Sequence, residues 1–367
     1  MNILFNPLDT LFFKDGKPFS MGSETWADGN LLPNPSVLYG AIKSVYYSSH
    51  PEELQKVVEN KMDPAADKIE IKSIYYKLGG NTYFPLPLDV VEIKNKDFQV
   101  KNREKIKKRY SVIKLTKADF EFATEINKVN YFSLNEEVEN IEGGFFNNVE
   151  LKKYLTELSQ SFTVIRLSDY ILSEPKVGIG RENLTRTTAE GKLYRVDMKR
   201  YNDAKNNYFR FGVETEGIDS LDISFAKLGA ENKITEIEID SEKPEIDIID
   251  DLNIGSTFKV YLSTPAIFEK GWLPSWIDEK TFEGEINGIK LKLISAFIGK
   301  PLNIGGFDMA NNKPKPMKKA VPAGSVYYFE LLTEDKNSLP QIFHSKSISE
   351  FGTSKMGYGI TYLGVLK

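Results

Sequence analysis

The chain has 367 residues, enough for two domains, and its 41% of hydrophobic and 27% of charged residues predict a folded globular protein. It contains no cysteine and only two histidines, His50 and His344, which excludes disulfide frameworks, cysteine nucleophiles, thiolate metal sites and histidine-rich metal centres. We therefore expect no metal and no cofactor. No long apolar run and no signal-peptide pattern occur, so the sequence predicts a cytoplasmic protein with no membrane partner.

Charge is segregated along the chain, although the formal net charge is only -4. Residues 94–117 hold ten lysines or arginines against two acids, a net of +8, and residues 176–210 hold nine against four, a net of +5. Residues 214–251 hold thirteen acids against three lysines, a net of -10. The second basic region is a candidate for contact with an anionic partner, whereas a solvated, charged insertion is the stronger interpretation of the first.

The chain opens with a predicted strand and helix. Residues 3–13 are rich in aliphatic and aromatic side chains and are followed by a turn, which is typical of a strand. Asn34 suits a helix N-cap and Pro35 the first helical position. The apolar residues that follow recur with helical spacing, and they are Leu38, Ala41, Ile42, Val45 and Tyr46. A second helix is expected from Ser49 to Glu59.

A large insertion is expected next, at about residues 65–175. Residues 69–93 form short strand-like runs around the Gly79-Gly80-Asn81 turn, the first basic region follows, and residues 151–158 can form a short helix.

The pattern of a domain core then resumes. Residues 193–201 and 209–213 alternate apolar with polar side chains and predict a hairpin with one apolar and one basic face. A helix is expected between a cap at Ser220 and a stop at Gly229, followed by a strand at 234–239. The order strand, helix, hairpin, helix, strand is the βαββαβ order of a ferredoxin-like domain.

An acidic linker, residues 240–251, separates this pattern from a new one that begins at Phe258. The remaining length suits one more unit of the same kind. The sequence thus predicts an α+β fold of two ferredoxin-like (RRM-like) domains, with residues 1–248, including the insertion, in the first and residues 249–367 in the second.

The basic hairpin has the composition of a single-stranded RNA site, because cations that neutralise phosphate stand beside rings on which bases can stack. Solvated charge on a strand face is the alternative. A neighbouring threonine-rich loop can donate hydrogen bonds to phosphate or ribose. The candidate residues are Arg181, Arg186, Thr187, Lys192, Arg195, Lys199 and Arg200.

Glycine-rich loops with lysines recur in the second domain. Gly352 and Gly357 have the spacing of a phosphate-binding P-loop, but Tyr358-Gly359 stands where Lys-Ser or Lys-Thr is required. Such a loop can still bring backbone N–H groups close to phosphates, and glycine required for steric reasons is an equally weighted interpretation. The candidate residues are Gly305, Gly306, Lys315, Lys318, Lys319, Lys355, Gly357, Tyr358 and Gly359.

Other conspicuous residues favour structural roles or leave the choice open. His344 has no acid nearby in sequence to orient it, and His50 precedes Pro51 at a helix start, so we expect neither to be catalytic. Trp272 and Trp276 flank Pro274, and the sequence does not decide between local packing and a protein interface.

Motifs across nearly the whole chain are specific in combination, although each is weak alone. They are Pro7–Phe19, Leu32–Ala41, Val177–Ile179, Thr185–Thr187, Leu193–Tyr194, Ser263–Phe268, Gly305–Asp308, Pro314–Pro316, Val321–Tyr327 and Gly357–Gly359. In this order they resemble the RAMP-superfamily proteins that form the third subunit of the Cmr complex in type III-B CRISPR effectors.

The resemblance implies two ferredoxin-like RAMP domains and a non-catalytic role in antiviral defence, in which the protein caps the 5′ tag of the CRISPR RNA. It implies two protein partners, the large polymerase-like Cmr subunit and the backbone RAMP Cmr subunit. With that role, Asn34, Ser36 and Lys43 at the first helix start become further candidates for an anion contact. Two alternatives remain open: a RAMP-type RNA-processing endoribonuclease, and a protein-only scaffold.

Overall fold

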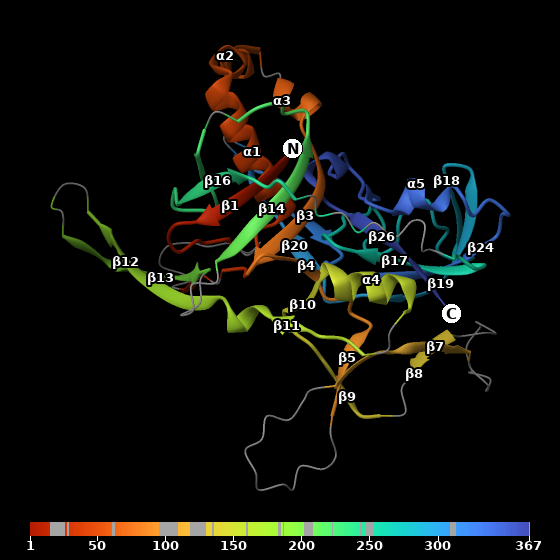
Figure 1. Ribbon diagram of the computed structural model, residues 1–367. Coiled ribbons are helices and arrows are strands. Elements are labelled where there is room, and N and C mark those ends of the chain that lie inside the picture. Colours follow the sequence, from red (N-terminus) through yellow and green to blue (C-terminus); the bar gives the residue numbers. More distant parts are fainter. Residues whose placement is uncertain are drawn as a thin grey trace, which may run out of the picture.

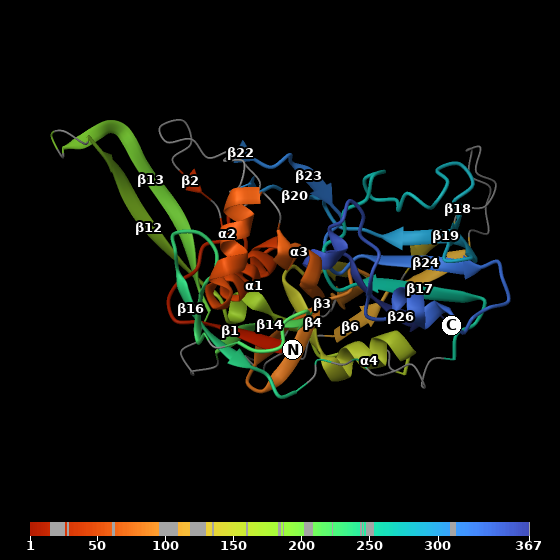
Figure 2. The same cartoon turned by 90° about the horizontal axis from the view of Figure 1, so that it is seen from above.

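The computed structural model describes residues 1–14, 26–27, 29–60, 63–94, 109–117, 130–133, 136–158, 161–182, 185, 187–201, 208–221, 223–242, 244, 246, 253–308 and 313–366. The fold mixes helices and strands, and most of its strands belong to two antiparallel sheets that lie side by side (Figures 1 and 2). None of the helices in these ranges combines the length and the apolar character that a bilayer crossing needs.

The larger sheet has the strand order β11-β10-β4-β3-β14-β1-β16-β15. β1 is an inner strand, and its buried Phe5 pairs with Phe211 on one side and Ile237 on the other. The strands expected at 209–213 and 234–239 are confirmed, whereas the strand expected at 3–13 ends at Pro7, after which Leu11 forms an isolated bridge with Lys199. The bounds of the strands of this sheet are β1 (Asn2–Pro7), β3 (Glu70–Leu78), β4 (Asn81–Pro85), β10 (Gly144–Asn147), β11 (Ile165–Arg166), β14 (Phe209–Glu216), β15 (Phe225–Lys227) and β16 (Ile234–Ile239).

The first helix covers one face of this sheet. The predicted stripe of five apolar residues in α1 (Pro35–Ser49) is buried in the same core as β1, which confirms the helix and its orientation. α2 (Pro51–Asn60) confirms the second helix, and His50 lies in the turn between the two. The expected helix at 151–158 corresponds to α4 (Asn148–Thr156), and two short elements complete this part, α3 (Pro64–Lys68) and the 3-10 helix η1 (Leu167–Asp169).

The second sheet has the order β18-β19-β24-β17-β26-β25 and packs on both faces. Phe258 and Val260 of β17 contribute to a core of their own beneath α5 (Leu339–Phe343), whereas Tyr261 joins the core of the larger sheet. The bounds are β17 (Thr257–Leu262), β18 (Glu283–Ile286), β19 (Ile289–Phe297), β24 (Val326–Leu331), β25 (Lys346–Ser347) and β26 (Ile360–Val365).

A buried polar network fixes the junction between the two sheets. The Asp89 carboxylate is fully buried and accepts hydrogen bonds from the hydroxyls of Tyr154, at 2.8 Å, and Tyr328, at 2.6 Å. The Lys259 ammonium lies 3.9 Å from the centre of the Tyr154 ring and 3.6 Å from a carboxylate oxygen of Glu157. Burial raises the pKa of Asp89 and lowers that of Lys259. Since Asp89 and Tyr154 precede the acidic linker and Tyr328 follows it, the network ties the two halves together.

Two sequence-based expectations between residues 193 and 229 are wrong. β13 (Thr188–Arg200) pairs with β12 (Leu172–Arg181) in a long projecting arm, because both sides of β14 are already occupied by β1 and β3 (Figure 1). No helix follows in the described part of 220–229; residues 225–227 are instead β15. The segment contains Asp222 and two serines, with Asp219 directly before it, and these residue types favour turns over helix interiors.

The remaining strands form small sheets at the periphery. β3, β4, β10 and β11 lie within the range expected to be an insertion but are hydrogen-bonded members of the larger sheet. The first basic region, residues 94–117, lies in part outside the described residues.

The peripheral strands are β2 (Trp26–Ala27), β5 (Val90–Ile93), β6 (Arg109–Val112), β7 (Lys114–Lys117), β8 (Asn130–Ser133), β9 (Val138–Asn140), β20 (Leu302–Ile304), β21 (Phe307–Asp308), β22 (Lys313–Pro314) and β23 (Lys318–Ala320).

Candidate nucleic-acid interface

Three of the predicted segments meet at one place: the start of α1, the β20–β23 hairpin and the glycine-rich loop 352–359. The Tyr358 hydroxyl donates a hydrogen bond to Ser36 Oγ at 3.0 Å. Ile304 and Ala320, from the two strands of the hairpin, pack in one buried cluster with Tyr358. Segments separated by more than 250 residues are thus held in contact, as a shared binding surface would require.

The glycines of this loop are required by its backbone and its packing. Gly357 has a φ of +84°, and a Cβ there would lie 2.7 Å from Cγ2 of Ile71 in β3. Gly359 has a φ of +69°, and a Cβ there would lie equally close to Ser349. The steric interpretation therefore accounts for both glycines. It does not determine what the outer face of the loop binds.

Tyr358 is not available as a stacking surface. Its side chain is 1% exposed, and burial raises the pKa of its hydroxyl. The residue instead anchors the loop to the start of α1. Tyr358 was predicted to be an RNA-binding residue; we correct its role to that of a structural link.

Lysines surround this meeting point. Lys315, Lys319 and Lys355 are exposed, and within the described residues none of them has a carboxylate partner. The Lys355 ammonium donates to the Asp67 carbonyl, at 3.4 Å. Lys318 is half-buried, and its ammonium lies 4.0 Å from the centre of the Phe351 ring, which places the hairpin beside the loop. Between β20 and β23, the backbone N–H of Lys315 donates to the Gly306 carbonyl at 2.9 Å. This bond holds the segment of Gly305 and Gly306 against the segment of Lys315.

A cleft of about 530 Å³ lies between the two halves of the chain and beside the β20–β23 hairpin, because Asn303 and Ile304 of β20 line it and pair with Lys319 and Lys318 of β23. Its walls are mainly apolar, and its lining residues include no charged side chain; among the polar ones are Asn34, Thr264 and Asn303. Asn34 makes no capping hydrogen bond through its side chain. An uncharged cleft with amide groups beside a cationic rim can accept a planar base while the rim holds the adjacent phosphates.

Lys43 does not belong to this rim. Its ammonium forms an ion pair with Asp63, and the Asp63 carboxylate also accepts from the Tyr47 hydroxyl at 2.6 Å. Burial opposes ionisation of Asp63, but the hydrogen bonds from Lys43 and Tyr47 outweigh it and lower its pKa. Lys43 is therefore neutralised within the fold, which corrects its predicted role as an anion contact.

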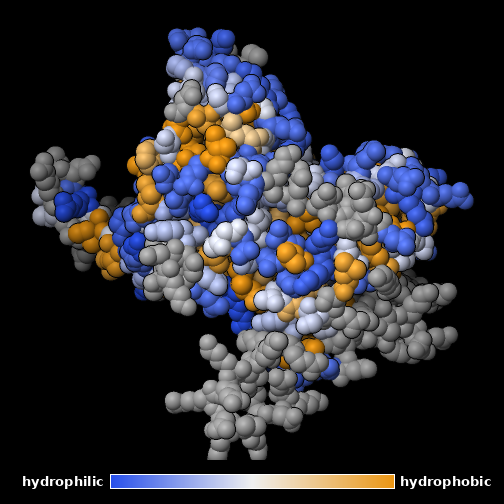
Figure 3. Space-filling model, in the orientation of Figure 1, coloured by the Kyte–Doolittle hydropathy of each residue, from blue (hydrophilic) through white to orange (hydrophobic). Residues whose placement is uncertain are grey.

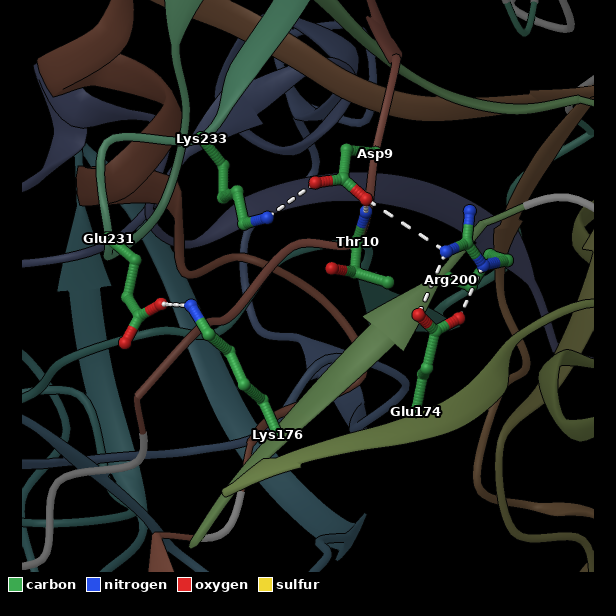
Figure 4. Close-up of polar contacts among 7 residues, drawn as sticks. All are labelled: Asp9, Thr10, Glu174, Lys176, Arg200, Glu231 and Lys233. Carbon is green, nitrogen blue, oxygen red and sulfur yellow. Dashed lines mark hydrogen bonds and ion pairs between the residues drawn. The ribbon is translucent and has the colours of Figure 1, made fainter. Parts of the chain in front are cut away.

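The cations at the base of the β12–β13 arm are likewise engaged (Figure 4). The Arg200 guanidinium donates to both carboxylate oxygens of Glu174, at 2.6 and 2.9 Å, and Lys233 pairs with Asp9. The hydrogen bond from Lys233 is the main cause that lowers the pKa of Asp9. Lys199 is buried, and its ammonium pairs with Asp197 at 2.5 Å. Arg200 and Lys199 thus stabilise the arm instead of presenting free charge.

The expected basic face of the hairpin is also corrected farther out on the arm. Val177, Ile179 and Leu193 share a face with Arg195 by strand register, and all three are exposed, so this face is largely apolar (Figure 3). Arg195 is half-buried.

The tip of the arm carries the polar remainder of the predicted site. Arg181 and Thr187 are exposed, and the hydroxyls of Thr185 and Thr187 lie 2.7 Å apart. Arg186 and the side chain of Lys192 lie outside the described residues. The arm and the loop 352–359 are linked only indirectly, because Tyr201 at the arm's end donates to the Leu31 carbonyl and residues 30–35 line the cleft.

The remaining conspicuous side chains are assigned by their surroundings. His344 is 7% exposed, and its Nε2 donates to the Ile246 carbonyl at 2.8 Å, so it is packed inside the fold. Trp276 stacks near Phe329 and Phe343, whereas Trp272 is 43% exposed. Sequence reasoning missed the cleft, because Thr264, Asn303 and their neighbours carry no charge. The prolines beside them, which mark these segments as loops, are the one sequence signal that could have drawn attention to them.

Comparisons with known proteins agree on one group. The family model described as CRISPR-associated protein (Cas_Cmr3) matches residues 3–366. The CRISPR system CMR subunit Cmr3 of Saccharolobus solfataricus is 23% identical over 335 residues, which cover 88% of this chain and 84% of the relative.

Solved structures resemble the fold. Chains in the cryo-EM structures of the type III-B Cmr-beta bound to cognate target RNA, with and without AMPPnP, each match at a TM-score of 0.50, with 16% and 17% identity respectively. Each match covers 89% of this chain and 86% of the other.

Proposed function

Because the chain belongs to the Cas_Cmr3 family of CRISPR-associated proteins, we propose that it is a non-catalytic subunit of a type III-B CRISPR effector complex that caps the 5′ tag of the CRISPR RNA. The match of the family model to residues 3–366 is the observation that carries this proposal. A capping role needs phosphate and base contacts but no bond cleavage.

The lysine-rimmed cleft is the proposed site of the tag. Lys315, Lys319 and Lys355 are the phosphate contacts, together with the backbone of the glycine-rich loop, and the cleft accepts a base. The exposed arm tip, with Arg181 and Thr187, is a second contact farther along the RNA. Two observations support this proposal. The three lysines lack carboxylate partners among the described residues, and the two halves of the chain meet at the cleft.

The two halves are proposed to be ferredoxin-like RAMP domains, residues 1–248 and 249–367. Four strands of the larger sheet occur in the order β16-β1-β14-β3, and four of the second sheet in the order β26-β17-β24-β19, all antiparallel. In both sheets these are, in spatial order, the fourth, first, third and second of the four strands along the chain. This is the strand order of the split βαβ, or ferredoxin-like, fold. In the described residues each unit retains one of the two helices, α1 in the first and α5 in the second.

In this role the protein bridges the large polymerase-like Cmr subunit to the backbone RAMP Cmr subunit, in the cytoplasm. The nuclease alternative is not favoured, because His344 is buried against Ile246 and cannot reach an RNA. The scaffold alternative differs in one respect: it places no RNA against this chain.

Cross-linking of the assembled complex tests the proposal. CRISPR RNA carrying 4-thiouridine in the 5′ tag should cross-link to peptides from 302–320 and 351–359, whereas 4-thiouridine near the 3′ end should not. Tag cross-links confined to other subunits would reject the capping role and favour the scaffold. Cleavage of precursor RNA that His344→Ala abolishes would instead support the nuclease.

A further inference from the structure

A phenylalanine at the surface stands in a backbone conformation that bulky side chains rarely adopt. Phe351 has a φ of +57° and Gly352 a φ of +68°, and the Thr353 N–H donates to the Glu350 carbonyl at 3.1 Å. A turn with two left-handed central residues is normally built from asparagine, aspartate or glycine, because a larger side chain there is strained. Gly352 meets this requirement and Phe351 does not. Strain that persists at a surface position points to a function of the side chain that causes it.

The turn that carries Phe351 is fixed to the rest of the second half. The Glu350 N–H donates to the Ile267 carbonyl at 2.9 Å. Its carboxylate accepts from the backbone N–H groups of Glu269 and Ser275, at 2.6 and 2.7 Å. The ring is therefore presented by a fixed backbone, and the carboxylate next to it in sequence is already engaged by two donors.

The packing of Phe351 does not account for its ring. Its side chain is 55% exposed and belongs to none of the buried apolar clusters of the described residues. The Lys318 ammonium lies over the ring, 4.0 Å from its centre. With a cation over one face, the opposite face and the ring edge account for the exposure. A planar group can stack on that opposite face while the cation stays in place.

The surroundings of the ring favour a nucleic acid over a protein. Lys318 has no carboxylate partner in the described part of the chain, and Lys355 follows Phe351 in the same loop. Lys318 also pairs with Ile304, which lines the cleft, so the ring lies one strand pair away from the proposed base pocket. A protein would have to bring acidic groups to these lysines, whereas an RNA strand supplies both a planar base and anionic phosphates.

We propose that Phe351 is a stacking platform for one base of the CRISPR RNA tag, next to the base that enters the cleft. The turn holds the ring in position, and Lys318 supports it from the far side. The inference rests on the proposed function and deepens it by adding a second base contact to the tag site. Because every base has a face that can stack, this contact adds affinity without selecting a sequence.

Photo-cross-linking in the assembled complex tests the contact directly. 5-Iodouridine reacts most readily with an aromatic ring on which it is stacked. With 5-iodouridine at each tag position in turn, one position should cross-link to Phe351 and its neighbours should not. Cross-links to 302–320 without any to Phe351 overturn the inference alone. A tag that cross-links only to other subunits overturns the proposed function as well.

Substitutions separate stacking from a structural role. Phe351→Gly removes the ring and relieves the strained φ, so tag affinity of the assembled subunits should fall at least about fivefold, while the melting temperature of the chain does not fall. The loss should be the same factor at every salt concentration, because stacking neutralises no phosphate. Phe351→Tyr should keep the affinity. The matched control is Phe225→Ala, which removes a similarly exposed ring on β15 and should change nothing.

Two results contradict the proposal. Unchanged tag affinity in Phe351→Gly would show that no base stacks on the ring. A Phe351→Gly chain that fails to enter the complex, while the Phe351→Tyr chain enters it, would assign the ring to a protein contact instead.

Discussion

Replacing Lys315, Lys319 and Lys355 together by alanine should reduce the salt dependence of tag binding. Each single-stranded phosphate neutralised adds about 0.7 to the slope of log affinity against log salt. If the site neutralises roughly five phosphates, the slope for the wild type is about -3.5, and removal of three contacts leaves about -1.4. Between 50 and 200 mM salt, affinity should then fall about 100-fold for the wild type but only about 7-fold for the variant.

Fluorescence anisotropy of a labelled tag RNA, titrated with the assembled protein subunits at several salt concentrations, measures this slope. The matched control replaces Lys290, Lys336 and Lys346, which are also exposed but belong to β19, the segment before α5, and β25 instead of the hairpin or the glycine-rich loop. Both variants change the net charge equally, so long-range attraction is matched. Equal slopes for the two triple variants would refute the assignment of the phosphate contacts.

Gly357→Ala should lower the melting temperature, because a φ of +84° and a Cβ 2.7 Å from Ile71 cost about 1–3 kcal/mol; an unchanged calorimetric transition contradicts this. Asp89→Ala should cost about 2–5 kcal/mol in urea unfolding, since two buried tyrosine donors lose their acceptor; a loss near zero would mean that they find another. Asp63→Asn should destabilise at neutral pH, and the destabilisation should shrink as the pH falls below 3.8. Burial opposes ionisation of Asp63, but hydrogen bonds from Lys43 and Tyr47 hold its pKa in the folded protein below the ordinary 3.8. The stabilisation by the carboxylate is therefore present above pH 3.8 and is lost as the pH falls through the lower pKa of the folded state. A difference in melting temperature that stays constant between about pH 7 and about pH 2 would argue against this role of Asp63.

Local patterns predicted most of the elements; one failure involves long-range pairing and one a misleading local pattern. The helix at Pro35 and the strand at 234–239 follow from periodicity and caps alone. The partner of β13 does not, because the choice between β12 and β14 depends on β1 and β3 occupying both edges of β14, and these strands come from distant parts of the sequence. The false helix before Gly229 arose from Leu221, Phe225 and Leu228, whose spacing is helical but which lie among Asp222 and two serines that favour turns.

The candidate site failed in a different way. Sequence identified cations but not their partners, so Lys43 and Arg200 were indistinguishable from Lys315 and Lys319. Asp63 and Glu174, which neutralise the first two, lie 20 and 26 residues away and contact them only in the fold. The cleft could not be predicted at all, because uncharged loop residues give no compositional signal.

The distribution of partnered and unpartnered cations bears on how the site is built. Charges at the base of the arm and beside α1 are paired, and pairing of this kind positions elements while contributing little net stability. The junction beside the cleft is fixed instead by the buried Asp89 network, in which every lost partner leaves a costly polar group. Leu88, next to Asp89, lines the cleft, so the network fixes one of its walls. Under the proposed function, a cleft fixed in this way favours a tag that fits it, so selectivity for the tag follows from the rigidity of the junction as well as from the bases that enter the cleft.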